Sequence, residues 1–380
     1  MDDKQGFPHY MLKEIFEQPR GVRDTILPRI SEQDARVHFD DSRLDDFHID
    51  RNELRALRRI NIVASGTSRH AGMVGQYMIQ DLVNIPVDVD YASEFEYRNP
   101  MIGPGELTIV ITQSGETADT TAAQREAKAK GSRTVAISNV VDSTIAREAD
   151  GVLYTNSGPE VSIASTKAFT AQMALLYLFA VYLAQERGPF RGEQIGGHLR
   201  ELLDIPVKIG TVLQCASICE RLASRYSQAQ DFLFLGRAIH YPIAMDGALK
   251  LKEVSYVHAE GYPTGETKHG PNALIDEHMP VVIIATCDRN DPGSILRYEK
   301  NLANIRGFKA QGAHVIAIIS EDDEQTDKVA DQVIPVPRAP ELLLPILEIV
   351  PLQLFAYYVA VRKGLDVDRP RNLVKSVTQE

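Results

Sequence analysis

The chain has 380 residues, and its 41 Lys and Arg against 52 Asp and Glu give a net charge of −11. This length predicts about two to three domains. A share of 44% hydrophobic and 24% charged residues is typical of a soluble globular protein, and argues against a disordered or fibrous one. The excess of acids argues against nucleic acid or an anionic membrane as a partner, because both bind clustered basic residues.

Three cysteines are too few for a disulfide framework, and the first residues lack the apolar segment of a signal peptide. The longest strongly apolar run, residues 173–184, is shorter than the roughly 20 residues of a membrane helix. We therefore expect a cytoplasmic protein that has no membrane partner.

Residues 1–50 are charged and mostly helical or irregular, and Pro19 predicts a helix stop. Beyond them, short apolar runs alternate with longer helical patterns, which is typical of an α/β fold with a parallel sheet. Strands of the first half are predicted at 60–66, 87–91, 107–112, 134–138 and 152–155, and helices at 117–130 and 165–185.

The second half repeats this order at similar intervals. Its strands are predicted at 231–235, 280–285, 314–319 and 333–336, and its helices at 242–257 and 294–310. A repeat of this length indicates a duplicated domain rather than a solenoid. The last helix, 342–362, carries Pro345 and Pro351 and is expected to be kinked or broken. We expect this layout: 1–50 N-terminal segment, 51–190 first domain, 191–225 helical connection, 226–362 second domain and 363–380 tail.

Hydroxyl side chains gather where two strands of the first half end. Thr112-Gln-Ser-Gly-Glu-Thr117 follows one strand and opens a helix, and Ser65-Gly-Thr-Ser68 follows another. Backbone N–H groups, hydroxyls and a positive helix end suit a phosphate, although the same residues could serve only as helix caps. Since strand ends in such sheets form the ligand crevice, two convergent loops favour phosphate.

The second half differs from the first in the loop that corresponds to Thr112–Thr117 and in the residues of one of its helices. Its equivalent loop, 287–291, carries two aspartates that would repel phosphate, so we expect one phosphate per chain. Its helix places Asp246, Lys250 and Glu253 on one stripe. Such a stripe is usually a solvated face with ion pairs, but a carboxylate beside a lysine at the ligand edge could also move protons.

Other signals are weaker. His269 is of a type that suits acid–base work near neutral pH, although a loop histidine is usually a surface residue. Cys215 and Cys219 are predicted to be packed thiols, and neither a metal site nor any cofactor is expected. Residues 66–72 do not match a dinucleotide-binding fingerprint.

At these residues the sequence resembles the isomerase region of glucosamine-6-phosphate synthases, which consists of two sugar-isomerase (SIS) domains. The resemblance runs from residue 9 to residue 380, and its most specific runs are 113–120, 164–172 and 248–253. It implies two flavodoxin-like, three-layer αβα domains with parallel sheets. It also implies that sugar phosphate is held by these residues: Thr67, Ser68, Thr112, Gln113, Ser114, Thr117, and a further loop of Ile163, Ala164 and Ser165.

The resemblance also implies catalytic roles. Glu253 matches the carboxylate that moves a proton between C1 and C2, and Lys250 matches a lysine beside it. His269 matches the ring-opening histidine, which the partner subunit of a homodimer contributes. Lys375 matches a tail lysine assigned to Schiff-base formation or proton transfer, so the tail is expected to be more than a frayed end.

The chain departs from the family pattern in three places and in one larger respect. Ser65 stands where Cys is usual, the surroundings of Thr112 vary, and Asp246 stands where Glu is usual, which could alter the preferred sugar. No cysteine precedes Cys215 to act as the glutaminase nucleophile, so glutamine is not expected to be a nitrogen donor. Free ammonia or a separate glutaminase would then supply nitrogen, whether the chain is an excised domain or a natural stand-alone protein.

The sequence therefore predicts a homodimeric sugar-phosphate isomerase that interconverts fructose 6-phosphate and glucosamine 6-phosphate through an open-chain intermediate. One alternative is a stand-alone glucosamine-6-phosphate deaminase or fructosamine-6-phosphate deglycase. Another is a sugar-phosphate sensor without enzymatic activity. The direction of the reaction stays open at this point.

Overall fold

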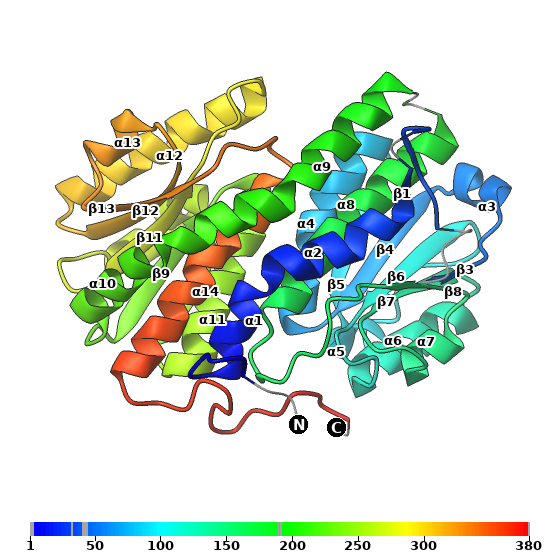
Figure 1. Ribbon diagram of the computed structural model, residues 1–380, viewed down its shortest axis with the longest axis horizontal. Coiled ribbons are helices and arrows are strands. Elements are labelled where there is room, and N and C mark those ends of the chain that lie inside the picture. The colour runs from blue at the N-terminus through cyan, green and yellow to red at the C-terminus, as the bar shows by residue number, and fades with distance from the viewer. Residues whose placement is uncertain (1–3, 32, 40–44, 189, 191, 379–380) are drawn as a thin grey trace. The chain divides into compact units, whose positions relative to one another are not determined.

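A computed structural model describes residues 4–31, 33–39, 45–188, 190 and 192–378 (Figure 1). The chain divides into two compact units whose segments interleave. Unit 1 comprises residues 1–19, 161–166 and 205–373, and unit 2 comprises residues 20–160, 167–204 and 374–380. The contiguous domain bounds expected from the sequence stay a prediction.

Unit 2 contains a six-stranded sheet in the order β3-β8-β7-β6-β4-β5. All neighbours are parallel except β3, which pairs antiparallel with β8. The strands are β3 (Asp46–Phe47), β4 (Arg59–Ala64), β5 (Val87–Tyr91), β6 (Glu106–Ile111), β7 (Arg133–Ser138) and β8 (Gly151–Tyr154). The five strands predicted for the first half are thus confirmed, with ends that differ by one or two residues.

Helices cover both faces of this sheet. Val63, Val110 and Ala136 share a buried cluster with residues of α5 (Ala92–Phe95), α6 (Ala118–Ala129) and α7 (Thr144–Glu148). Because strand side chains alternate between faces, Ile62 points the other way and contacts α4 (Gly66–Val83). Helix α8 (Lys167–Arg187) packs on α4 and is buried along almost its whole length. The unit is therefore a three-layer αβα domain.

Unit 1 contains a five-stranded parallel sheet in the order β10-β9-β11-β12-β13. The strands are β9 (Asp231–Gly236), β10 (His258–Pro263), β11 (Pro280–Ala285), β12 (His314–Ser320) and β13 (Gln332–Val336). When the antiparallel β3 is left out, the five parallel strands of each sheet read 2-1-3-4-5 in chain order, the flavodoxin-like arrangement, which confirms the duplicated fold. Sequence reasoning missed β10, whose polar, glycine- and proline-containing segment lacks the apolar pattern of a buried strand.

Helices also cover both faces of the second sheet. Ile305 and Phe308 of α12 (Pro292–Ala310) pack on one face. On the other lie α11 (Tyr241–Ser255) and α14 (Leu344–Arg362), side by side in Figure 1. A side chain at Gly261 of β10 would overlap the backbone of α11 at Met245, so only glycine permits this close approach.

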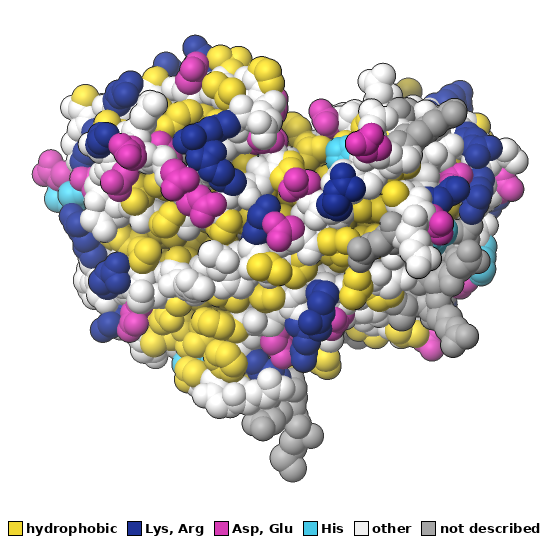
Figure 2. Space-filling view, turned by 45° about the horizontal axis from the view of Figure 1, so that its top comes forward, with side chains coloured by type: hydrophobic (Ala, Val, Ile, Leu, Met, Phe, Trp, Pro, Cys, Tyr) yellow, Lys and Arg dark blue, Asp and Glu magenta, His cyan; other side chains and the backbone are white. Residues whose placement is uncertain are grey.

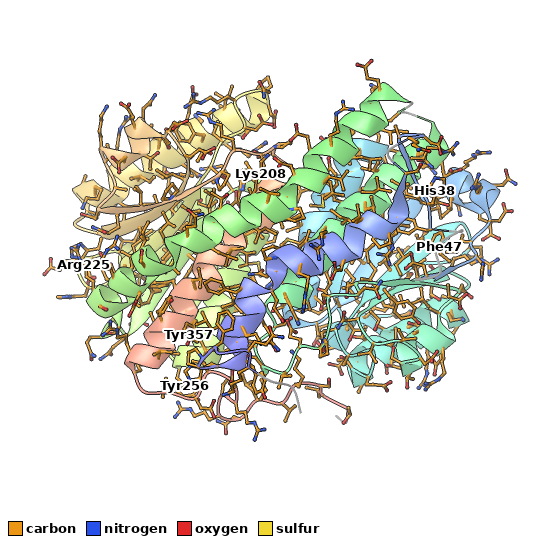
Figure 3. The ribbon with its side chains drawn as sticks, in the orientation of Figure 1. His38, Phe47, Lys208, Arg225, Tyr256 and Tyr357 are labelled. Atoms are coloured by element: carbon orange, nitrogen blue, oxygen red, sulfur yellow. The ribbon has the colours of Figure 1, made fainter. Side chains whose placement is uncertain are left out.

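The expected break in the last helix does not occur. Helix α14 is continuous, with Pro345 in its first turn, where no N–H donor is needed, and Pro351 in its interior. Figure 3 marks Tyr357 on this helix, and its hydroxyl lies 2.8 Å from His9 Nδ1. The helix is almost wholly buried and continues through Pro351, so it is not broken there, and a kink at this residue stays a prediction.

The remaining elements complete the description of the chain. They are α1 (Tyr10–Phe16), α2 (Gln18–Ile26), β1 (Ile30–Ser31), β2 (Arg36–Val37), α3 (Arg51–Ala56), α9 (Glu193–Val212), α10 (Ala216–Tyr226) and α13 (Glu324–Asp327), with 3-10 turns at Leu27–Arg29, Leu213–Cys215, Ala238–His240, Thr264–His269 and Pro271–Leu274. The helix stop predicted before Pro19 is present, because α1 ends at Phe16.

Three helical stretches within the described residues are long and apolar enough to cross a membrane by length and composition alone. In Lys167–Arg187 and Leu344–Arg362, 94% and 89% of the most apolar window is already buried inside the protein, against 44% in Glu193–Tyr226. Packing within the domains therefore accounts for the hydropathy of two of the three. On the face in Figure 2, acidic and basic side chains are mixed rather than gathered by sign.

Candidate active site

The Thr112–Thr117 loop of unit 2 is built around its own hydroxyl groups. Thr112 follows β6, and its Oγ1 accepts a hydrogen bond from the Gly115 N–H at 3.2 Å and lies 3.2 Å from Thr117 Oγ1. Gly115 has φ +71°, and a Cβ there would overlap the side chain of Ser143. The loop thus needs glycine at its tip, and its hydroxyls converge at the N-terminus of α6.

The acidic residue of this loop is turned away from the hydroxyl groups. The Glu116 carboxylate accepts hydrogen bonds of 2.8 Å from both the backbone N–H and the hydroxyl of Thr144. The backbone N–H of Thr144 is the main cause of a lowered pKa for this exposed carboxyl, with smaller contributions from the Thr144 hydroxyl and the charge of Arg147. The Glu116 carboxylate is therefore hydrogen-bonded to the first residue of α7.

The second hydroxyl loop follows β4 at the point where the strand order reverses. Thr67 is buried in the first turn of α4, and Ser68 Oγ accepts a hydrogen bond of 3.1 Å from Gln172 Nε2 of α8. Strands β4 and β6 are neighbours, so the two loops leave adjacent strand ends, as predicted. This edge of the sheet has the donors that a phosphate requires.

The C-terminal tail reaches the same unit. The N–H of Ala118, at the start of α6, donates to the carbonyl of Val377 at 3.0 Å. Lys375 Nζ lies 2.7 Å from Glu160 Oε2, and the side chain of Glu160 is fully buried. The structure thus places Lys375 in the unit that carries the hydroxyl loops, in a tail that makes specific contacts with that unit.

In unit 1, helix α11 carries the predicted carboxylate and lysine. Lys250 Nζ donates to Glu253 Oε2 at 2.5 Å. Asp246 and Lys250 are fully buried, whereas 22% of the Glu253 side chain is exposed. Burial excludes the solvated-face interpretation of this stripe. A partly exposed carboxylate beside a buried ammonium is an arrangement suited to proton transfer.

Of the remaining predicted residues, Gln113 lies in unit 2 and the others lie in unit 1. In the loop 161–166, Ala164 is buried, Ile163 and Ser165 are half-buried, and the Ile163 N–H donates to the Asp368 carbonyl at 3.1 Å. His269 is exposed at the end of the 3-10 turn Thr264–His269. Gln113 is half-buried, and its carbonyl accepts from the Asn139 N–H at 3.3 Å.

The equivalent edge of the second sheet is filled by the chain's own side chains. His240, after β9, places Nδ1 3.0 Å from Glu348 Oε2 and Nε2 3.1 Å from Glu341 Oε1. Thr286, after β11, donates its hydroxyl to Glu348 at 2.5 Å, and Arg297 Nε donates to Glu341 at 2.7 Å. Carboxylates thus occupy the switch point where the other unit has loop hydroxyls.

The pKa values of this network follow from its geometry. Burial alone lowers the pKa of His240, but the charges of Glu348 and Glu341 outweigh it and raise the pKa to about 10. Burial raises the pKa of Glu341, but the charge of His240 and hydrogen bonds from His240 and Ser294 lower it to about 2. His240 is therefore a buried imidazolium at neutral pH, held by two carboxylates.

Sequence reasoning found the hydroxyl loops and the α11 stripe but missed Glu160 and the network around His240. Glu160 lies in an irregular segment, and the members of the network are up to 108 residues apart. No local pattern marks either group. Thr286 directly follows strand β11, just as Thr112 directly follows strand β6. Only this position of a threonine after a strand could have drawn attention to the carboxyl edge of the second sheet.

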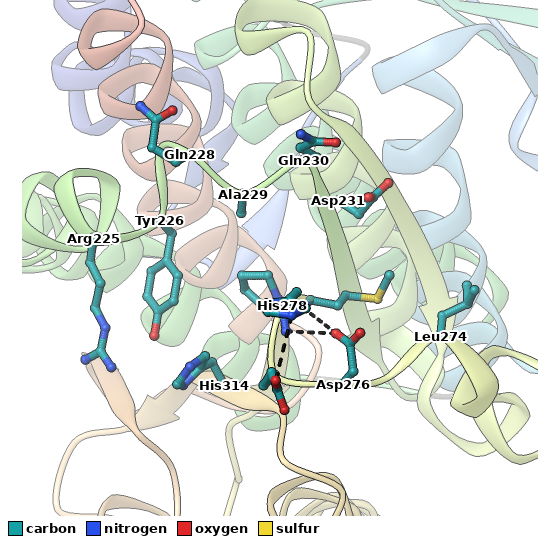
Figure 4. Close-up of a pocket in the computed structure, with 13 residues that line it drawn as sticks. Arg225, Tyr226, Gln228, Ala229, Gln230, Asp231, Leu274, Asp276, His278 and His314 are labelled. Atoms are coloured by element: carbon teal, nitrogen blue, oxygen red, sulfur yellow. Dashed lines mark hydrogen bonds and ion pairs between the residues drawn. The ribbon is translucent and has the colours of Figure 1, made fainter.

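The described cavities do not contain the predicted site residues. A cavity of about 640 Å³ lies at the amino ends of β9, β11 and β12, where Tyr226 and His314 lie with ring centroids 6.2 Å apart (Figure 4). Another, of about 630 Å³, lies at the carboxyl ends of β11 and β12 beside Cys287. Within the described part of the chain, no group of three or more His, Cys, Asp or Glu side chains could hold a metal ion.

Comparison with known proteins supports the duplicated fold. The family model for the SIS domain matches residues 53–182 and 225–363. The chain is 48% identical over 378 residues to glutamine–fructose-6-phosphate aminotransferase (isomerizing) of Chlorobaculum tepidum, and 47% identical over 378 residues to that of Thermus thermophilus. These matches cover 100% of this chain but only 59% and 60% of the relatives.

Solved structures agree with this assignment. The C-terminal domain of glucosamine-fructose-6-phosphate aminotransferase from Francisella tularensis is similar with a TM-score of 0.88 and 36% identity, covering 97% of this chain and 100% of that one. Glucosamine-6-phosphate deaminase from Thermotoga maritima has a TM-score of 0.72 but 21% identity, covering 97% and 99%, a likeness of fold alone. The chain belongs to the SIS domain family and carries two SIS domains in tandem.

Proposed function

We propose that this chain is a sugar-phosphate isomerase of the glucosamine-6-phosphate synthase type. In the synthetic direction, fructose 6-phosphate and ammonia give glucosamine 6-phosphate and water. The observation that carries the proposal is the buried Lys250 ammonium, 2.5 Å from the partly exposed Glu253 carboxylate. The identity of 48% to an isomerizing aminotransferase supports the same substrate class.

The hydroxyl loops hold the phosphate in this proposal. Thr67, Ser68, Thr112, Ser114 and Thr117 supply side-chain donors. Backbone N–H groups at the start of α4 and α6 add partial positive charge, since helix N-termini favour anions. Gln113, Ile163, Ala164 and Ser165 line the sugar.

The proton transfer needs one base that reaches two adjacent carbons. After ring opening by His269, ammonia adds to the C2 carbonyl and water leaves, forming an imine at C2. Glu253 takes a proton from C1 and returns it to C2, and the proton of the C1 hydroxyl passes to the nitrogen, which leaves an aldehyde at C1 and an amine at C2. Lys250 holds the carboxylate in place through its hydrogen bond, and Lys375 contacts the open-chain sugar.

The nitrogen donor is free ammonia, or ammonia from a separate glutaminase. A cysteine nucleophile requires a lowered thiol pKa. Burial and the neighbouring Cys215 raise the pKa of Cys219, and burial raises that of Cys287. Neither has the character of a nucleophile that attacks glutamine. The free thiols are those of a cytoplasmic protein.

We propose a homodimer in which His269 acts on the partner subunit's sugar. His269 is exposed at the end of a short turn, where a second copy can reach it. Mixing the variants Glu253→Gln and His269→Ala tests this, because a mixed dimer keeps one intact pair of the two residues. Activity that neither variant has alone supports donation between subunits, and its absence at proven subunit exchange contradicts it.

The direct test incubates the purified chain with fructose 6-phosphate plus ammonium, fructose 6-phosphate plus glutamine, and glucosamine 6-phosphate alone. Formation of glucosamine 6-phosphate from ammonium but not from glutamine supports the proposal. Fructose 6-phosphate and ammonia formed only from glucosamine 6-phosphate would indicate a deaminase. Binding without turnover in every arm would indicate a sensor.

A further inference from the structure

Glu160 is a buried carboxylate of unit 2, and its contacts include the start of α8 and Lys375. Its Oε1 accepts a hydrogen bond of 3.1 Å from the Ala168 N–H in the first turn of α8. Its Oε2 lies 2.7 Å from Lys375 Nζ. The Glu160 side chain is 0% exposed and that of Lys375 is 25% exposed, so the carboxylate is fixed inside the domain while the ammonium keeps access to solvent.

A carboxylate in this position is stable only because it is paired. Taking an ionised carboxyl group out of water costs several kcal/mol unless opposite charge and hydrogen bonds compensate. The N-terminus of the 21-residue helix α8 supplies one compensation, because its free N–H groups favour an anion. Lys375 supplies another, and it comes from a tail that has no secondary structure of its own.

The tail has a second contact two residues beyond Lys375. The Val377 carbonyl accepts from the Ala118 N–H at 3.0 Å, at the first residue of α6. Helix α6 begins where the Thr112–Thr117 loop ends. The Glu160 pair and the Val377 contact together hold Lys375 in the unit that carries the hydroxyl loops. Without such contacts a lysine side chain, which has several rotatable bonds, must lose rotamer entropy before it can act in one position.

We infer that Glu160 is a positioning residue for Lys375, which it holds ready for the open-chain sugar. The inference rests on the proposed function, because only there does Lys375 act on a sugar. Since the phosphate is held by other residues, loss of Glu160 should affect turnover more than affinity. If Glu160 only stabilised the fold, its loss would not lower turnover selectively over affinity.

The test is kinetic and uses Glu160→Gln, which keeps the shape and the hydrogen bond to Ala168 but removes the charge. We expect kcat to fall by roughly 10- to 100-fold, the usual consequence of misplacing a reacting group, while KM changes little. Glu160→Asp keeps the charge and should recover part of the loss. The matched control is Glu186→Gln. It removes a different buried carboxylate, which pairs with Arg55 and lies near the other end of α8.

A second measurement does not depend on activity. Lysine acetylation with a limiting reagent, followed by mass spectrometry, compares Lys375 with the exposed Lys363 of the same chain. Labelling of Lys375 relative to Lys363 should rise several-fold in Glu160→Gln and stay unchanged in Glu186→Gln. An inactive parent protein would refute the proposed function, yet the labelling would still report the Glu160–Lys375 pair.

Two results would overturn the inference. One is unchanged relative labelling of Lys375 in Glu160→Gln, which would mean that the carboxylate does not hold the ammonium. The other is an active parent whose Glu160→Gln variant has the same kcat as Glu186→Gln. If Glu160→Gln does not fold, Glu160→Asp serves in both measurements, and parental values in both would equally refute the positioning role.

Discussion

Replacing Glu341 by glutamine would remove one carboxylate from the buried network around His240 while keeping the size of the side chain. Glu341 is 8% exposed and His240 2%, so water cannot take over the lost contact. Arg297 and Ser294 would also lose their charged acceptor. Glu348 would remain as the single carboxylate beside the imidazolium.

The pKa values give the size of the effect. A fall in the pKa of Glu341 from its ordinary 4.5 to about 2 corresponds to roughly 3 kcal/mol of folding free energy, at about 1.36 kcal/mol per pKa unit. The rise for His240 from 6.5 to about 10 would give a larger value, roughly 5 kcal/mol. The two disagree because His240 reports attraction by both carboxylates. The expected loss for Glu341→Gln is the smaller value, roughly 3 kcal/mol. The two free energies cannot be added, because both describe the same ion pair between Glu341 and His240.

Thermal unfolding measured by calorimetry tests this magnitude. A loss of roughly 3 kcal/mol should lower the melting temperature of unit 1 by about 6–12 °C, for a domain of 150–250 residues. The matched control is Asp322→Asn, which removes an exposed carboxylate 3.6 Å from Arg338. Such exposed pairs contribute about 0–1 kcal/mol, so the control should melt close to the parent.

The dependence on pH has a definite sign. Because the folded pKa of Glu341 is lowered, its contribution is present above pH 4.5 and is lost as the pH falls towards 2. Because the folded pKa of His240 is raised, its contribution is complete below pH 6.5 and is lost as the pH rises through about 10. Glu341→Gln should therefore lose stability less steeply than the parent between pH 4.5 and 2. An unchanged acid limb, or a melting temperature equal to that of Asp322→Asn, would refute the reasoning.

Three further predictions concern the proposed site. Glu253→Gln should lower turnover by roughly 10²–10⁴-fold, the usual contribution of a general base, with little change in sugar-phosphate affinity measured by calorimetry; near-parental turnover would move the base role to His269 or Lys375. Gly115→Ala should weaken phosphate binding by at least about tenfold, because it combines positive φ with overlap on Ser143. Gly188→Ala, at φ +90° with nothing within 4 Å, controls for backbone strain alone, and equal affinity in both variants would contradict the loop's role. A crystal soaked with sugar phosphate should hold one phosphate per chain, in contact with Ser114 and Thr117, and density for phosphate beside Asp288 would disprove confinement to the first SIS domain.

Much of the architecture could be predicted from local patterns. Buried parallel strands are short apolar runs, so nine of them were found within one or two residues of their ends. Hydroxyl residues directly after such runs identified the loops at β4 and β6, because strand ends in a parallel sheet share one edge. The edge strand β10 was missed because its segment His258–Pro263 contains polar residues, a glycine and a proline instead of an apolar run. Of the two outcomes expected for α14, the break is wrong, since the helix continues through Pro351, and the kink stays a prediction.

The sequence by itself determined the order of strands and helices, the duplication, the positions of the hydroxyl loops and the membership of the SIS family. Those properties depend on residues close together in the chain. Only the tertiary structure decided which charged residues are buried and with what partner. Lys250 lies in a stripe that could equally be solvated, and Glu160 meets Lys375 across 215 residues of sequence. The environment of a charge depends on segments that folding brings together, and solvation, hydrogen bonding and pKa follow from that environment rather than from the residue's neighbours in the chain.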